Sequence, residues 1–452
     1  MTRFFSTIFL AAIALPAVAQ NRAVAALPAA PAPAINVQTT GSAQPQTLTR
    51  SDAERLAILH NPRISVGRLL ALAQHQVLRE ARSSELPTVT GSITAEQAED
   101  GSRLSAGSLT ASRLLTHAGA GGQVSQLITD FGRTRNLIAA QKLQEKAQNS
   151  NALAVTEDIV LATDQAFYNA LQAQAMLRVA TQTVETRQTT DTLVTQMTRN
   201  KLKSTLDQSF ADVDLSQAKL LQLDARNNAD STMAALDAIL GLDHSVQYQL
   251  EQDPTPIAPP PADPDSLVKT ALAQRPDLQS LTYGHQSAQK FATAQRDQML
   301  PTISALGVAG SVPIRPAAYY TNNWWGAVGV NMNVPIFNGF LYSAQSKEAG
   351  IRAEAAAEHA RALRDDIVRD VRTAWLAANT AYQRVSVTGE LAKQADLAMQ
   401  LAQTRYKLGL SSIVELSQAQ LQQAEAQISN TNAIYQYRLA LATVQYETGT
   451  QP

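Results

Sequence analysis

The chain has 452 residues, and its 37 basic and 38 acidic side chains give a formal charge of −1. This balance provides no general attraction to nucleic acid or anionic lipid, so a nucleic-acid partner is not expected. The sequence has no cysteine, which excludes disulfides, thiolate metal sites and cysteine nucleophiles and argues against a lipidated N-terminus. Clustered catalytic residues and histidine pairs at metal-ligand spacing are also missing, so we predict no enzyme, no cofactor and no metal site.

The first residues are typical of a secretory signal. Arg3 precedes an apolar run over residues 4–15, and Ala17-Val18-Ala19 follows as a cleavage motif. We therefore predict a signal peptide over residues 1–19 and a flexible leader, rich in alanine and proline, over residues 20–47. No later stretch reaches the roughly 18 apolar residues of a membrane-spanning helix, so any membrane crossing is expected to use β-strands.

The rest of the sequence contains an internal repeat. The matching pairs, in order, are Asn61-Pro62 with Arg275-Pro276, Leu86-Pro87 with Leu300-Pro301, Asp130 with Asn338, Thr198-Arg199 with Thr404-Arg405, and Gly241 with Gly449. Their order never changes and their spacing is nearly constant. We predict a first repeat over residues 48–250, a proline-rich linker over 251–264 and a second repeat over 265–449.

Each repeat predicts the same elements in the same order. A helix runs toward Leu-Pro, two short strands separated by a loop follow, and a very long helix then turns into a second long helix. In the second repeat small and apolar residues recur at alternating steps of four and three: Ile367, Val371, Ala374, Ala378, Ala381, Val385, Thr388, Ala392, Ala395, Met399, Ala402 and Tyr406. In the first repeat the same pattern runs from Ile159 to Val184. An ordinary antiparallel bundle is the alternative, but one helix from Phe340 to Tyr406 would be about 100 Å long.

The predicted strands alternate between apolar and polar residues. Over 327–334 one face carries Val328, Val330, Met332 and Val334, and over 88–95 one face carries Val89 and Ile93. This alternation is typical of membrane β-barrel strands, in which the apolar face contacts lipid. A half-buried strand of a soluble sheet is the alternative. Because two strands per repeat cannot close a barrel, we expect the chain to oligomerise.

Three junction sequences complete the pattern, namely Leu127-Ile128-Thr129-Asp130-Phe131-Gly132-Arg133, Val334-Pro335-Ile336-Phe337-Asn338-Gly339 and Arg405-Tyr406-Lys407-Leu408-Gly409-Leu410. Their duplicated order resembles the TolC-like outer-membrane efflux family over residues 48–449. The resemblance implies a mainly α fold with membrane β: two tandem repeats, each with two short barrel strands plus long antiparallel helices. It implies a homotrimer that forms a 12-stranded β-barrel, surrounded by outer-membrane lipid, on an α-helical barrel in the periplasm.

The resemblance also implies a function. Such a channel is the passive exit duct of a tripartite efflux pump or type I secretion system, and its partners are a periplasmic adaptor (a membrane fusion protein) and an inner-membrane transporter. Glu415 matches an acidic ring at the pore gate, whereas Gln418 replaces the acid expected one turn later, and Tyr406 matches a residue that holds the closed state. The adaptor-contact tip maps to Leu408, Gly409 and Leu410, with Leu202 and Lys203 as counterparts in the first repeat.

Two alternatives remain open. Glu415 lies near the start of a predicted helix, where an acidic side chain is also favoured by the helix dipole alone. The whole chain could instead be a periplasmic coiled-coil adaptor or scaffold without a pore. Adaptors usually flank one hairpin with lipoyl-like β-domains, whereas both repeats carry a strand pair here.

Overall fold

The structure is a computed structural model that describes residues 46–97, 103–106, 109–113, 117–242, 248–252, 256–261, 263–311 and 324–450. The predicted signal peptide and nearly all of the predicted leader lie outside the described residues. The repeats and the linker between them belong to one structural unit, which covers residues 47–452. In the part of the chain that is described, we find no helix with both the length and the apolar content of a membrane span.

Both repeats fold into the same series of elements. The first comprises α1 (Arg50–His60), α2 (Pro62–Ser83), β2 (Thr88–Glu96), β5 (His117–Thr129), α3 (Arg133–Arg199) and α4 (Thr205–Leu240). The second comprises α5 (Pro264–Gln274), α6 (Pro276–Asp297), β7 (Thr302–Ser311), β8 (Trp324–Asn333), α7 (Leu341–Lys407) and α8 (Ile413–Glu447). The mainly helical fold with two equivalent halves and four principal strands is thus as the sequence predicts.

The structure also contains strands that were not predicted from the sequence. β3 (Arg103–Ala106) pairs with β4 (Leu109–Arg113) inside the region predicted as a loop between β2 and β5. β1 (Gln46–Leu48) pairs with β6 (Tyr248–Leu250), which ties the start of the first repeat to its end. The second strand of the second repeat ends at Asn333, one residue before the predicted end at Val334. Pro335 follows directly and has no N–H to donate to a neighbouring strand, so the strand does not continue.

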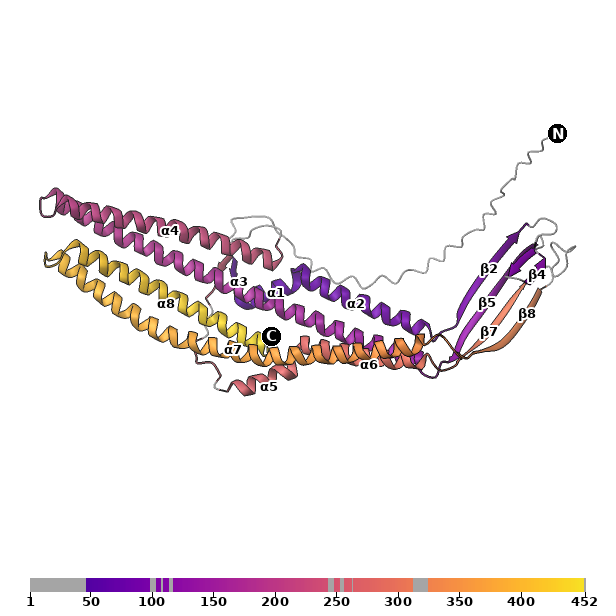
Figure 1. Ribbon diagram of the computed structural model, residues 1–452. Helices are drawn as coiled ribbons and strands as arrows, with labels where there is room; N and C mark the ends of the chain where they lie inside the picture. The colour runs from indigo at the N-terminus through magenta and orange to yellow at the C-terminus, as the bar shows by residue number, and fades with distance from the viewer. Residues whose placement is uncertain are drawn as a thin grey trace, which may run out of the picture. The chain divides into compact units, whose positions relative to one another are not determined.

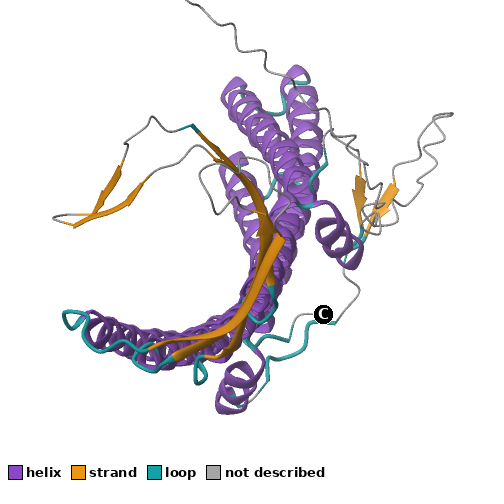
Figure 2. Cartoon of the chain, turned by 90° about the vertical axis from the view of Figure 1, so that its right-hand side faces the viewer, coloured by secondary structure: helices purple, strands orange, loops and turns teal. Residues whose placement is uncertain are grey.

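The four principal strands form one antiparallel sheet in the order β2-β5-β7-β8. Strands from the two repeats meet at the centre, where β5 pairs with β7. The sheet is curved, as Figure 2 shows in the view along the helices. Its outer strands, β2 and β8, each have one edge that no other strand of the described chain covers.

The helices form a wall that continues from the sheet (Figure 1). α3 and α7 have 67 residues each, which corresponds to about 100 Å as straight helices. α3 packs against α2 and α6 near the sheet and against α4 and α8 farther away, while α7 packs against α6 and α8. The predicted heptad on α7 is confirmed by burial over most of its length. Ile367, Val371, Ala374, Ala378, Ala392, Ala395, Met399, Ala402 and Tyr406 are buried, whereas Ala381, Val385 and Thr388 in the middle are half-buried.

Within each repeat, the residue before the Pro of the first anchor pair contacts the glycine at the end of the repeat. α4 ends at Gly241, which abuts the backbone of His60 and Asn61 at the start of α2. The Asn61 side chain caps α2 by accepting a hydrogen bond from the Arg63 N–H at 2.9 Å, and it donates to the Ile239 carbonyl of α4 at 2.9 Å. Gly449 abuts Arg275 in the same way after α8. α4 therefore stacks end to end with α2, and α8 with α6, beside the continuous helices α3 and α7.

Candidate functional site

The two helical hairpins end in tight turns at the far end of the wall from the sheet (Figure 1). In the first turn Lys201 has a φ of 58°, and in the second Gly409 has a φ of 76°. Each following helix begins with a serine cap: Ser204 accepts from the Asp207 N–H at 3.1 Å, and Ser412 accepts from the Glu415 N–H at 3.2 Å. The turns and the adjoining ends of α7 and α8 carry all the residues predicted as gate or adaptor-contact candidates.

Tyr406 is the central buried residue of this end of the wall. It is fully buried in a cluster with Val194, Ala211, Met399, Ala402, Ile413, Leu416 and Ala419, which come from all four helices. The Lys203 ammonium lies 4.5 Å from the centre of the Tyr406 ring, so a cation–π contact joins the two turns. Burial, and then the Asp207 carboxylate, raise the pKa of the Tyr406 hydroxyl.

The other predicted residues of the turns are accessible. Glu415 and Gln418 are exposed, and the Glu415 carboxylate lies 3.1 Å from the Nε of Arg405 on α7. Leu202, Leu408 and Leu410 are between 66% and 70% exposed, so these three leucines are accessible at the turns. Gly409 is exposed and Lys203 is half-buried. The structure therefore brings the predicted gate and tip residues together at one end of the wall.

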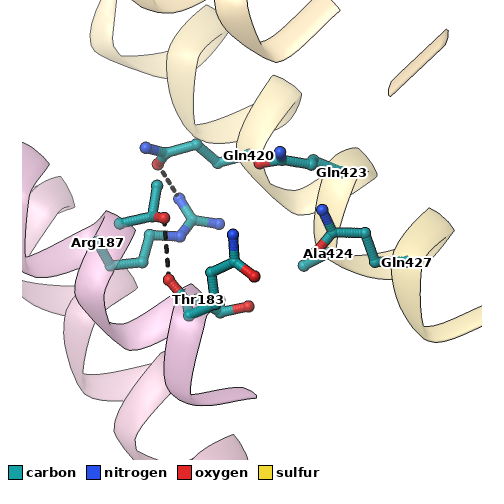
Figure 3. Close-up of a pocket in the computed structure, with 8 residues that line it drawn as sticks. Thr183, Arg187, Gln420, Gln423, Ala424 and Gln427 are labelled. Carbon is teal, nitrogen blue, oxygen red and sulfur yellow. Dashed lines mark hydrogen bonds between the residues drawn. The ribbon is translucent and has the colours of Figure 1, made fainter. Parts of the chain in front are cut away.

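A buried polar cluster lies on the seam between the two hairpins, about 20 Å inward from the turns. Arg187 of α3 is only 8% exposed at its side chain, and it contacts Asp214 of α4 at 3.0 Å. Its Nη1 also donates to Gln420 of α8 at 2.5 Å (Figure 3). Gln420 in turn donates to Thr190, and Ser417 donates to Asp214. Burial lowers the pKa of the Arg187 guanidinium, and Asp214 partly offsets that effect.

Polar contacts continue from this cluster across the second hairpin. A small pocket beside Arg187 is lined by Gln182, Thr183, Thr186, Gln420, Gln423, Ala424 and Gln427 (Figure 3). On its far side Gln423 and Gln427 both donate to Asp396 of α7, at 2.8 and 3.1 Å. Charged and amide side chains thus link the four helices at this level, beside the buried alanines Ala392, Ala395 and Ala426 that pack between α7 and α8.

Arg187 was not among the residues predicted from the sequence, although the sequence contains a signal for it. The heptad that runs to Val184 continues in register to Arg187 and Asp191, so two charged residues occupy core positions. A charge at a core position needs a buried partner. The partners, Asp214 and Gln420, lie on other helices and could not be identified from spacing.

A second charged cluster lies where α8 meets α6. Arg275 pairs with Asp277 at 2.6 Å and also with Glu447. Nearby, the Tyr446 hydroxyl donates to Asp158 at 2.5 Å. Burial raises the pKa of Glu157 to about 7, with further contributions from Asp277 and Asp158 and a partial offset from Arg275. Asp277, Glu447 and Glu157 thus share one buried arginine, and Asp158 adds a further negative charge nearby, so the folded chain binds a proton at Glu157 more tightly than the unfolded chain does.

This cluster makes stability depend on pH. The pKa of Glu157 rises from its ordinary value of 4.5 to about 7 on folding. Its contribution to stability is therefore fully present below the ordinary pKa and is lost as the pH rises through about 7. We expect Glu157→Gln to reduce the loss of thermal stability between pH 6 and pH 8 that the parent chain shows. Glu185→Gln, an exposed position on the same helix, is the control; an equal pH dependence in all three proteins would contradict the assignment.

Comparisons with known proteins agree with this architecture. The family model described as outer membrane efflux protein matches residues 53–242 and 267–450. The outer membrane efflux protein BepC of Brucella suis is 22% identical over 429 residues, which are 91% of this chain and 87% of BepC. The outer membrane protein TolC of Escherichia coli is 23% identical, over 73% of this chain and 68% of TolC.

Solved structures share the fold at low sequence identity. A crystal structure of CusC superposes with a TM-score of 0.78 at 18% identity, covering 89% of this chain and 92% of CusC. The outer-membrane channel OprN superposes with a TM-score of 0.78 at 16% identity, covering 89% of this chain and 90% of OprN. Together with the family match over both repeats, these observations show that the chain belongs to the outer membrane efflux protein family.

Proposed function

We propose that this chain is the outer-membrane exit duct of a tripartite efflux pump or type I secretion system, and that it conducts substrates passively from an inner-membrane transporter. The observation that carries the proposal is a curved sheet continuous with a curved helical wall, both with two open edges (Figure 2). A duct formed by three copies closes both sets of edges at once. Energy for transport then comes from the transporter, since the duct only conducts.

The sheet supports closure between copies. β2 and β8 each expose an unpaired row of backbone groups, which cannot remain unpaired in a lipid environment. Pairing β8 of one copy with β2 of the next closes a ring, and three copies of four strands form a 12-stranded barrel of a size known for membrane barrels. The contact between β8 of one copy and β2 of the next joins two different surfaces of the chain. Such a head-to-tail contact forms a closed ring, and a ring of three copies is a homotrimer.

The helical wall supports the same closure. Its edges are α2 and α4 on one side and α7 on the other, and they carry most of the exposed apolar side chains of the helices. They include Val66, Leu69, Leu70 and Leu72 on α2, Leu206, Phe210, Val213, Leu220 and Leu223 on α4, and Val387, Leu391, Leu397 and Leu401 on α7. α4 has six aspartates against two basic residues, whereas residues 367–407 of α7 have six basic against three acidic residues. The two edges are therefore complementary in charge.

The register of the sheet supports the proposed lipid-facing side. Val89 pairs with Val124, Val124 with Gly307, and Gly307 with Val328, so all four lie on one face. Ile93, Val330 and Met332 share that face, while Val334 continues its parity beyond the strand. The opposite face carries threonine, serine and asparagine from β2 and β8. We propose that the apolar face contacts outer-membrane lipid and that the polar face lines the lumen.

The turns supply the proposed gate and docking sites. Glu415 and Gln418 are proposed to form the constriction, and the buried Tyr406 is proposed to hold the closed state. The exposed Leu202, Leu408 and Leu410, with Gly409 and Lys203, are proposed to contact a periplasmic adaptor. The helical barrel then lies in the periplasm.

The chain is proposed to be exported by the signal at residues 1–19 and to remain unlipidated, because it contains no cysteine. The leader (20–47), the repeats (48–250 and 265–449) and the linker (251–264) complete the proposed organisation.

The test combines assembly with two neighbouring substitutions on β8. Cross-linking of the parent chain in detergent should give the mass of three chains, and planar bilayers should show discrete channel currents. Val330→Arg places a charge on the lipid face at a cost of roughly 2–4 kcal/mol per chain, so the trimer yield should fall sharply. Asn331→Arg points into the lumen and should assemble normally. A stable monomer that stays soluble without detergent would support the scaffold alternative, and equal loss of trimer in both variants would mean that the assignment of the two strand faces is wrong.

A further inference from the structure

The two hairpin turns of each chain carry an excess of positive charge. Five basic residues lie within them: Arg199, Lys201, Lys203, Arg405 and Lys407. Only two acidic residues, Asp207 and Glu415, lie within residues 199–209 and 403–415. The two turns adjoin, since the Lys203 ammonium lies 4.5 Å from the Tyr406 ring. The basic residues therefore form one surface at the end of the wall, which we call the basic tip.

Both acidic residues of the basic tip are already engaged within the chain. Glu415 is paired with Arg405 at 3.1 Å. Asp207 accepts from the Ser204 N–H at 3.2 Å in the capping box of α4, where its charge opposes the positive end of the helix dipole. Among the described residues no carboxylate lies within 4.0 Å of the charged groups of Arg199, Lys201, Lys203 or Lys407. The excess charge at the tip is thus positive.

Acidic residues farther along the hairpins offset this charge only in part. Asp214 is paired with the buried Arg187 at 3.0 Å. Burial and the neighbouring Asp212 raise the pKa of Asp191, so the Asp191 carboxyl holds its negative charge less readily than an isolated carboxylate would. Gln418, one turn after Glu415, is neutral. The position one turn after Glu415 therefore adds no second ring of carboxylates, which could otherwise make the net charge of the tip negative.

We infer that the entrance between the hairpin tips favours anions over cations, so the duct is suited to negatively charged solutes. This inference rests on the proposed function, because it requires three copies of the basic tip around one pore. Charged rings at a constriction set the sign of the preferred ion. Their field extends over about 10 Å at 0.1 M salt, which is comparable with the separation of neighbouring side chains at a narrow entrance. The paired Glu415 reduces the positive field but does not invert it.

The test is the reversal potential of single trimers in planar bilayers under a gradient of potassium chloride. We expect its sign to show that chloride is more permeant than potassium. Replacing Lys201 and Lys407 together with glutamine should lower the chloride-to-potassium permeability ratio roughly twofold or more, whereas Glu415→Gln should raise it by releasing Arg405. Arg361→Gln, a 71% exposed arginine side chain of α7 far from the turns, is the matched control and should leave the ratio unchanged.

The possible results separate the inference from the proposed function. Channels that conduct but prefer potassium, or a ratio that Lys201, Lys407 and Glu415 do not affect, would overturn the inference and leave the duct intact. At about 1 M salt the screening length falls to about 3 Å, so the field of the basic tip should weaken. A preference for chloride that persists undiminished at this salt concentration would overturn the inference as well. A chain that assembles no conducting trimer would overturn the proposed function, and this inference with it.

Discussion

Arg187→Met should be one of the most destabilising single substitutions in the helical wall, with an expected loss of about 2–4 kcal/mol in the free energy of unfolding. Methionine fills much of the same volume but cannot donate a hydrogen bond. The Asp214 carboxylate then loses its cation, and the buried Gln420 amide oxygen loses the donor at 2.5 Å. Buried polar groups that have lost their partners destabilise the fold by more than the intact pair stabilises it. We expect thermal unfolding of the trimer at a lower temperature.

The same substitution should have a local signature. Because Arg187 contacts both Asp214 on α4 and Gln420 on α8, its loss should raise amide hydrogen exchange on α8 near Ser417 and Gln420 more than elsewhere in the hairpins. Arg178→Met, an exposed arginine on the same helix, removes the same charge without a buried partner and should change little. Equal stability of the two variants would show that the polar cluster does not hold the seam.

A double-mutant cycle separates the pair from its surroundings. Asp214→Asn alone should also destabilise the wall, because Arg187 remains buried at 8% exposure without a carboxylate. The combination of Arg187→Met with Asp214→Asn should cost less than the sum of the two single losses, since the second change removes a charge already unpaired by the first. Strict additivity would mean that the two residues act independently.

The helical part of the fold could be predicted largely from the sequence, because its signal is periodic and long. The heptad from Ile367 to Tyr406 predicts which face of α7 is buried, and the burial follows it. What the pattern cannot supply is the order of helices in the wall, because alanine at core positions fits several neighbours equally well. The contacts of Arg187 depend on that order, so they emerge only in the folded chain.

In the sheet, the faces of the two outer strands could be predicted from the sequence, whereas the pairing of the strands could not. β2 and β8 carry valine, isoleucine and methionine in alternation, so each strand predicts its own two faces. β5 and β7 are rich in glycine and alanine over residues 117–122 and 305–310, which carry almost no alternation. Only the register shows that Val89 and Val328 share a face through Val124 and Gly307.

The repeat predicted equivalent positions but not which of them touch. Asn61 and Gly241 each have a counterpart in the second half, and the structure places them against one another at the junction of α4 with α2. Asn61 caps one helix and holds the end of the other, while Gly241 allows the close approach. This arrangement explains why position 61 carries a side chain that can cap a helix and why position 241 carries glycine, whose backbone is in the left-handed conformation.

Gly241→Ala should destabilise the first repeat by about 2–5 kcal/mol, because two costs combine. The backbone at Gly241 has a φ of 71°, a left-handed conformation that alanine adopts with difficulty. A Cβ at this position would lie 2.8 Å from the carbonyl oxygen of His60 and 3.0 Å from its carbonyl carbon. Both are backbone atoms, so relief requires the stacked ends of α4 and α2 to move apart, which would also stretch the hydrogen bond from Asn61 to Ile239.

A series of three glycines measures each cost by itself. Gly409 has a φ of 76° with open space where a Cβ would be, so Gly409→Ala should show only the backbone cost of about 1 kcal/mol. Gly449 has a φ of 65° and a Cβ position 3.3 Å from the Arg275 nitrogen, and its alanine variant should fall between the other two. Urea unfolding of the three detergent-solubilised variants gives the ranking. If Gly241→Ala costs no more than Gly409→Ala, the ends of α4 and α2 are not in close contact, and the stacking of short helices beside α3 would have to be abandoned.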